Sequence, residues 1–86
     1  MMQTRVAVIA IVVENPDSVA DVNRLLHEAA DCILGRMGLP YREKGVSLIS
    51  VAIDAPQDVI SALSGKIGAL PGVSAKTAYS NVVTTE

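Results

Sequence analysis

The chain has 86 residues. Domains usually contain about 100–200 residues, and this chain falls below that range, so we expect a single domain over residues 1–86. Its net charge is −2, and its sequence contains no block of basic residues of the kind that binding to nucleic-acid phosphates requires. Its single cysteine, Cys32, excludes an internal disulfide bond and any multi-cysteine metal site.

The aliphatic content predicts self-association. Half of the residues are hydrophobic, and only Tyr41 and Tyr79 are aromatic. A chain of this length buries only about 60 % of the surface that its unfolded form exposes. Large apolar patches that stay on a surface usually mark interfaces. We therefore expect a homo-oligomer, either a dimer or a tetramer built as a dimer of dimers.

The first predicted element is a buried strand at residues 5–13. Both of its alternating faces are apolar, with Val6 and Val8 on one and Ile9 and Ile11 on the other. The run is shorter than the about 20 residues that span a bilayer, so we expect no membrane contact. No small-residue cleavage pattern follows it, which argues against a secretory signal. We expect a cytoplasmic protein.

A helix is predicted to follow that strand. Asn15 is a suitable cap, and Pro16 suits the first helical position. Apolar residues then recur at helical spacing as far as Ala29, with charged residues on the other side. Arg24 and Glu28 lie one turn apart and can form an ion pair.

Residues 32–39 are predicted to form the second strand. Gly35 and Gly38 would each destabilise a helix interior by about 1 kcal/mol, which argues against a longer helix. Simple alternation places four residues of this strand on one face: Ile33, Gly35, Met37 and Leu39.

The remaining elements complete a common supersecondary pattern. They are a hairpin connection at 40–45, a strand at 46–54, a helix that opens at Ala55-Pro56 and ends near Gly68, a turn at Pro71-Gly72, a strand at 73–82 and a frayed tail at 84–86. The order β-α-β-β-α-β predicts an α+β ferredoxin-like sandwich, in which a four-stranded antiparallel sheet carries two helices on one face. The other face is left uncovered, and Leu34 and Leu48 are expected to point to it. A second copy of the chain is the expected cover.

Residues that could perform catalysis are few. His27 is expected on the solvated side of the first helix. Cys32 would be nucleophilic only beside a cation or a base, and we expect it to be a small buried residue. His27 and Cys32 together could supply two ligands of a metal site between subunits, but two ligands from one chain are too few to predict a zinc or nickel site. The sequence therefore predicts no enzyme, no bound metal and no cofactor.

Polar side chains concentrate around the predicted hairpin. They belong to Arg36, Tyr41, Arg42, Glu43 and Lys44. Charged residues at a hairpin usually have no binding role and are simply the solvated side chains of the turn. Arg36, however, lies in the strand that enters the hairpin, where a guanidinium can hold a carboxylate or phosphate through two hydrogen bonds. Neighbouring glycines let a ligand or another backbone come close. These five residues are candidates for binding an effector or a partner protein.

The same region carries a family resemblance. The run GRMGLPYREKG at residues 35–45 resembles the signature of the iron-only hydrogenase system regulator family, as do residues 11–15 and 70–73. The resemblance implies an ACT-like version of the ferredoxin-like fold, similar to the effector domain of the nickel-responsive repressor. It also implies a regulatory activity. Asn15, at the end of the resembling run 11–15, is a further candidate for binding an effector or a partner protein.

Two departures from related domains limit what the resemblance implies. Amino-acid-binding ACT domains have a glycine after the first strand, where this chain has Asn15-Pro16. An amino acid is therefore not the expected effector. The nickel repressor uses several histidines and a cysteine for its metal, and it carries a DNA-binding segment. This chain has one histidine, and its first strand starts close to residue 1.

Three functions stay open at this stage. The first is a regulatory oligomer that senses a small effector or docks on a partner protein. The second is an accessory to a separate DNA-binding repressor, and the third is a non-catalytic assembly factor for a metallocofactor. The acidic charge favours the first, and we expect no direct sequence-specific binding to DNA.

Overall fold

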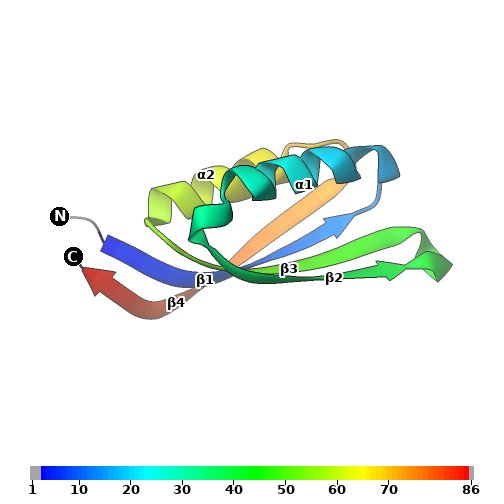
Figure 1. The fold of residues 1–86 in the computed structure, drawn as a ribbon. Helices are drawn as coiled ribbons and strands as arrows, with labels where there is room; N and C mark the ends of the chain where they lie inside the picture. Colours follow the sequence, from blue (N-terminus) through cyan, green and yellow to red (C-terminus); the bar gives the residue numbers. More distant parts are fainter. Residues whose placement is uncertain (1–2, 86) are drawn as a thin grey trace.

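The computed structural model describes residues 3–85, which form a four-stranded antiparallel sheet with two helices packed on one face (Figure 1). The elements are β1 (Gln3–Val13), α1 (Val19–Glu28), β2 (Ile33–Tyr41), β3 (Val46–Ala55), α2 (Gln57–Gly68) and β4 (Val73–Thr85). The strand order is β2-β3-β1-β4, so each helix connects two strands that flank a third. The predicted ferredoxin-like α+β fold is confirmed.

The hydrophobic core lies between the helices and the sheet face that they cover, which we call the inner face. On β1, Ile9 is fully buried and pairs in register with Val51 of β3, which is buried as well. The neighbouring Val8 belongs to the opposite, outer face and is 41 % exposed. The buried hydrophobic residues are Ala7, Ile9, Ile11, Val13, Val22, Leu25, Leu26, Ile49, Val51, Ile53, Ala55, Ile60, Leu63, Ile67 and Val73.

The start of α1 is fixed by two side-chain hydrogen bonds. Asn15 Oδ1 accepts the backbone N–H of Asp17 at 3.0 Å, so Asn15 is a cap as predicted, but it caps the 3-10 turn Pro16–Ser18, and α1 itself begins at Val19. A short 3-10 turn then leads into the helix. The buried Ser18 hydroxyl donates to the carbonyl of Pro71 at 2.7 Å, which ties the start of α1 to the turn before β4.

The two helices otherwise follow the prediction closely. On α1, Arg24 and Glu28 form the expected ion pair at 3.1 Å. The helix α2 ends at Gly68, as predicted. Its start differs by one position, since Pro56 has extended backbone angles and acts as the N-cap residue instead of the first helical residue.

The strand β2 departs from simple alternation near its start. It begins at Ile33, one residue later than predicted, and its register against β3 shifts between Ile33 and Gly35. Ile33 pairs with Ile53, a core residue, whereas Gly35 pairs with Ala52 on the outer face. This is a β-bulge, in which one strand carries an extra residue and its later side chains change face.

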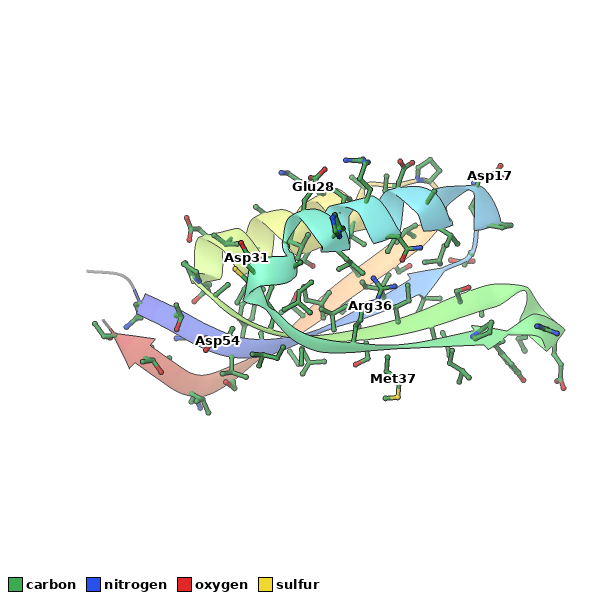
Figure 2. All side chains as sticks on the ribbon, viewed as in Figure 1. Asp17, Glu28, Asp31, Arg36, Met37 and Asp54 are labelled. Carbon is green, nitrogen blue, oxygen red and sulfur yellow. The ribbon has the colours of Figure 1, made fainter. Side chains whose placement is uncertain are left out.

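The bulge corrects the predicted faces of β2. Met37 and Leu39 lie on the outer face and are 72 % and 61 % exposed, so the prediction that they share a face with Ile33 was wrong. Arg36 lies on the inner face instead. Figure 2 shows Arg36 between β2 and α1, and Met37 on the side of the sheet away from the helices.

The ends of the last three strands extend beyond the predicted bounds. The strand β2 continues through Tyr41, so the hairpin connection is only the 3-10 turn Arg42–Lys44 and Gly45. The strand β3 includes Ala55, one residue more than predicted. At the C-terminal end, Thr85 pairs with Gln3, so residues 84–85 belong to the sheet and are not frayed; residue 86 lies outside the described residues.

Candidate functional site

A cleft of about 340 Å³ lies where the β2–β3 hairpin passes the start of α1. We call it the hairpin cleft; it is lined by Val13, Pro16, Val19, Pro40, Tyr41, Arg42, Gly45, Val46 and Ser47. Its walls are mostly apolar, with Arg42 as the charged group at the rim. The Tyr41 hydroxyl donates to Glu43 Oε2 at 3.5 Å, which links a third candidate residue to the cleft.

The other predicted site residues are placed differently. Asn15 precedes Pro16 at the edge of the hairpin cleft, but its Oδ1 is already engaged by the N–H of Asp17. Lys44 ends the turn and is exposed. Arg36 lines a separate cleft. The structure therefore gathers Tyr41, Arg42 and Glu43, and it separates them from Arg36.

The second cleft lies between α1 and β2 and has a volume of about 490 Å³. We call it the Arg36 cleft; it is lined by Asn23, Leu26, His27, Ala30, Ile33 and Arg36. Arg36 Nη2 donates to Asn23 Oδ1 at 2.7 Å. Asn23 was not predicted as a site residue, although Asn23 and His27 lie one helical turn apart and so share a helix face.

Neither of the two residues weighed as metal ligands is part of a ligand cluster. His27 is exposed on the wall of the Arg36 cleft, and Cys32 is a half-buried free thiol. Among residues 3–85, no group of three or more His, Cys, Asp and Glu side chains is arranged to hold a metal ion. Over the same residues, no helix is both long enough and apolar enough to cross a membrane.

The outer face of the sheet is a broad apolar surface. Its large exposed side chains, placed by the strand register, are Val8, Met37, Leu39 and Leu48. Between them lie small residues that leave the centre of the face flat: Ala10, Gly35, Ser50, Ala52 and Ala78. No element among residues 3–85 covers this face, because both helices pack on the inner one (Figure 1).

Comparison with known proteins places the chain in a family. Residues 5–77 match the model of the TM1266-like family, which is described as "Iron-only hydrogenase system regulator, putative". The chain belongs to this family. Its structure is similar to that of the uncharacterized protein TM1266 from Thermotoga maritima, with 38 % sequence identity and a TM-score of 0.85. The match covers 88 % of this chain and 96 % of that one. The resemblance read from residues 35–45 is thereby confirmed, and family membership supports a regulatory role.

Two more distant solved structures share only the fold. A formyltetrahydrofolate deformylase from Pseudomonas putida KT2440 has 19 % identity and a TM-score of 0.64, and the match covers 90 % of this chain but 29 % of that enzyme. An unknown protein from Galdieria sulphuraria has 17 % identity and a TM-score of 0.62, with 94 % and 48 % of the two chains covered. No curated protein matches the chain.

Proposed function

We propose that this chain is a regulatory module of the iron-only hydrogenase system that acts as a homo-oligomer and has no catalytic activity of its own. Membership of the TM1266-like family supports the regulatory role. The observation that supports the proposed homo-oligomer is the uncovered apolar outer face of the sheet. The free thiol of Cys32 is compatible with a reducing compartment such as the cytoplasm.

A second copy of this chain is the occupant that suits the outer face. Over the three strand rows from Val8 to Val12, Lys76 is the one charged residue at the outer positions, and it lies on the edge strand β4. Two such faces can meet around a two-fold axis without bringing many like charges together. Small residues such as Ala10 and Ala52 allow a second sheet to pack at the usual distance of about 10 Å.

The first test of this proposal is the substitution Leu48→Glu. Leu48 lies on the outer face and is 37 % exposed, so a folded single chain tolerates a glutamate there. In a face-to-face dimer the same change would bury a carboxylate from each copy, which is strongly unfavourable. We expect light scattering at micromolar concentration to give a multiple of 9.0 kDa for the wild type and the mass of one chain for this variant.

A matched control is the substitution Val59→Glu. Val59 is 39 % exposed, nearly the same as Leu48, but it lies on α2 in the helix layer. This variant is expected to stay oligomeric. A wild-type chain that scatters as a single 9.0 kDa species would rule the oligomer out.

We further propose that the hairpin cleft binds the effector or partner protein. The cleft combines apolar walls, including Pro16 and Val19, with the charged group of Arg42. Apolar walls with a few polar groups are typical of ligand sites, and the volume lies within the usual range of about 300–1,000 Å³. The β2–β3 hairpin projects at one end of the sheet (Figure 1), and three of its residues, Tyr41, Arg42 and Gly45, line the cleft.

The triple substitution Arg42→Ala, Glu43→Ala, Lys44→Ala tests this site. All three residues are exposed, so the free energy of unfolding should change by about 0.5 kcal/mol per substitution or less. We expect the oligomeric state to be retained, and ligand titration or a pull-down from the native host to show weaker binding. The double variant Asp58→Ala, Lys66→Ala removes exposed charges from α2 and serves as the control. If the folded triple variant bound as well as the wild type, the charged residues of the hairpin would have no role in binding.

A further inference from the structure

The bulge in β2 directs a cationic side chain into the Arg36 cleft. Without the register shift between Ile33 and Gly35, residue 36 would lie on the outer face, opposite Ile33. With it, Arg36 pairs in register with Val51, a core residue, and its side chain extends toward α1 (Figure 2). Bulges often serve to re-aim a side chain beside a functional site.

The guanidinium of Arg36 is exposed and hydrogen-bonded, but it is not neutralised. Its Nη2 donates to Asn23 Oδ1 at 2.7 Å, and an amide oxygen carries no net charge. Both ion pairs found among residues 3–85 belong to a different arginine, Arg24, which contacts Asp21 and Glu28 on α1. A guanidinium has five N–H donors, so Arg36 keeps donors and its full positive charge for another group.

The floor of the Arg36 cleft is apolar. Leu26 is 2 % exposed and Ile33 is half-buried, and Ala30 adds a third hydrocarbon side chain. The next inner-face position of β2 is Gly38, and a Cβ built there would meet no atom within 4 Å. The cleft therefore combines one positive charge with an apolar surface, and it has open space on the hairpin side.

We propose that the Arg36 cleft binds a small carboxylic acid with an apolar body. The carboxylate accepts two hydrogen bonds from the guanidinium of Arg36, because the planar fork matches the two coplanar oxygens. The apolar body covers Leu26 and Ile33. One guanidinium balances one negative charge, which favours a monocarboxylate over a phosphoryl dianion. This inference adds a second ligand site to the proposed regulatory role, on which it rests, and that site is distinct from the hairpin cleft.

The polar residues of α1 specify where the carboxylate lies. Asn23 is in the middle of the helix, and His27 is in its last turn. The C-terminal end of a helix carries partial negative charge and disfavours an anion. The carboxylate is therefore expected beside Asn23 and Arg36, while the imidazole of His27 forms the far wall of the cleft.

The experiment is a titration of the full ¹⁵N-labelled chain with benzoate, followed by two-dimensional NMR. We expect saturable shifts of the amides of Asn23, Leu26 and Arg36. Benzamide has the same shape without the charge and is expected to bind at least about tenfold more weakly, as charge-assisted hydrogen bonds predict. Inorganic phosphate is the third probe and is also expected to bind more weakly than benzoate.

Three arginine variants identify the group responsible for benzoate binding. Arg36→Gln should weaken benzoate binding at least about tenfold. Arg24→Gln removes an arginine of α1 that is already paired and should leave benzoate binding unchanged. Arg36→Lys keeps the charge without the fork and should fall between Arg36→Gln and the wild type.

Several results would overturn the proposal. They are the absence of saturable benzoate shifts in the cleft, equal binding of benzoate and benzamide, tighter binding of phosphate, and full binding by Arg36→Gln. The benzamide and phosphate comparisons use the wild type, so they stand even if a variant does not fold. Light scattering on the same samples separates this site from the proposed oligomer, because Arg36 lies on the inner face and its loss should leave the oligomeric state unchanged.

Discussion

Alanine in place of Gly72 is expected to destabilise the domain by about 2–5 kcal/mol, because it combines left-handed backbone strain with a steric clash. Gly72 has a φ of +67°, a region that residues with a Cβ rarely adopt. A Cβ at this position would lie 2.7 Å from the Cβ of Asn15 and 3.0 Å from its backbone nitrogen. Neither atom belongs to a flexible side-chain end, so the backbone itself would have to shift.

Gly45→Ala is the matched control for that prediction. Gly45 has almost the same φ, +66°, but a Cβ there would meet nothing within 4 Å. The Gly45→Ala variant should therefore lose only the about 1–2 kcal/mol of stability that left-handed backbone strain costs. Urea unfolding of both variants measures the difference. If both variants lost the same free energy of unfolding, the Asn15 backbone would move aside at little cost. The steric clash would then contribute nothing to the destabilisation by Gly72→Ala.

The contact of Gly72 with Asn15 also connects the fold to the hairpin cleft. The N–H of Glu14 donates to the carbonyl of Gly72 at 2.7 Å, so the loop after β1 is held against the turn before β4. Pro16, in that same loop, lines the hairpin cleft. A shift of the loop in Gly72→Ala is therefore expected to disturb the cleft as well as the stability.

Elements with strong local signals could be predicted from the sequence. The strand at 5–13 is β-branched on both faces, and this matches a central strand whose inner side is buried. Asn15 and Gly68 mark a helix start and a helix end through their own backbone and side-chain chemistry. Because the order of elements was correct, the fold class followed from it.

Features that depend on pairing between distant strands could not be predicted in the same way. The sequence of residues 33–35 does not indicate a bulge, because the register of β2 is set by its contacts with β3. The exposure of Met37 and the inward position of Arg36 both depend on that shift. The pairing of Thr85 with Gln3 is likewise a contact between the two ends of the chain.

The candidate site was predicted in composition but not in arrangement. Tyr41 and Arg42 do line one cleft, as their proximity in sequence allows. Their contact with the Pro16 region, and the hydrogen bond from Arg36 to Asn23, join segments that are far apart in the chain. Such contacts arise from the βαβ crossovers, which single-sequence periodicity does not place in three dimensions.

Ile9→Ala is expected to destabilise the domain by about 2–5 kcal/mol, as is usual when a buried isoleucine is truncated. Ile9 is fully buried between the sheet and the helices. A small domain has only about 5–15 kcal/mol of stability in total, so a large part of it would be lost. Denaturant unfolding at a fixed protein concentration measures the change.

The neighbouring substitution Val8→Ala separates the two faces of the same strand. Val8 is 41 % exposed on the outer face, so its truncation should change the stability of a single folded chain by no more than about 0.5 kcal/mol. If the outer face is the interface between copies, Val8→Ala should instead raise the dissociation constant of the oligomer, measured by light scattering over a dilution series. Ile9→Ala should leave that constant unchanged for the chains that remain folded. If Val8→Ala left the dissociation constant unaltered, the interface would have to exclude the centre of β1. An effect of Ile9→Ala on stability alone and of Val8→Ala on the dissociation constant alone would show that one strand supports the core on one side and self-association on the other.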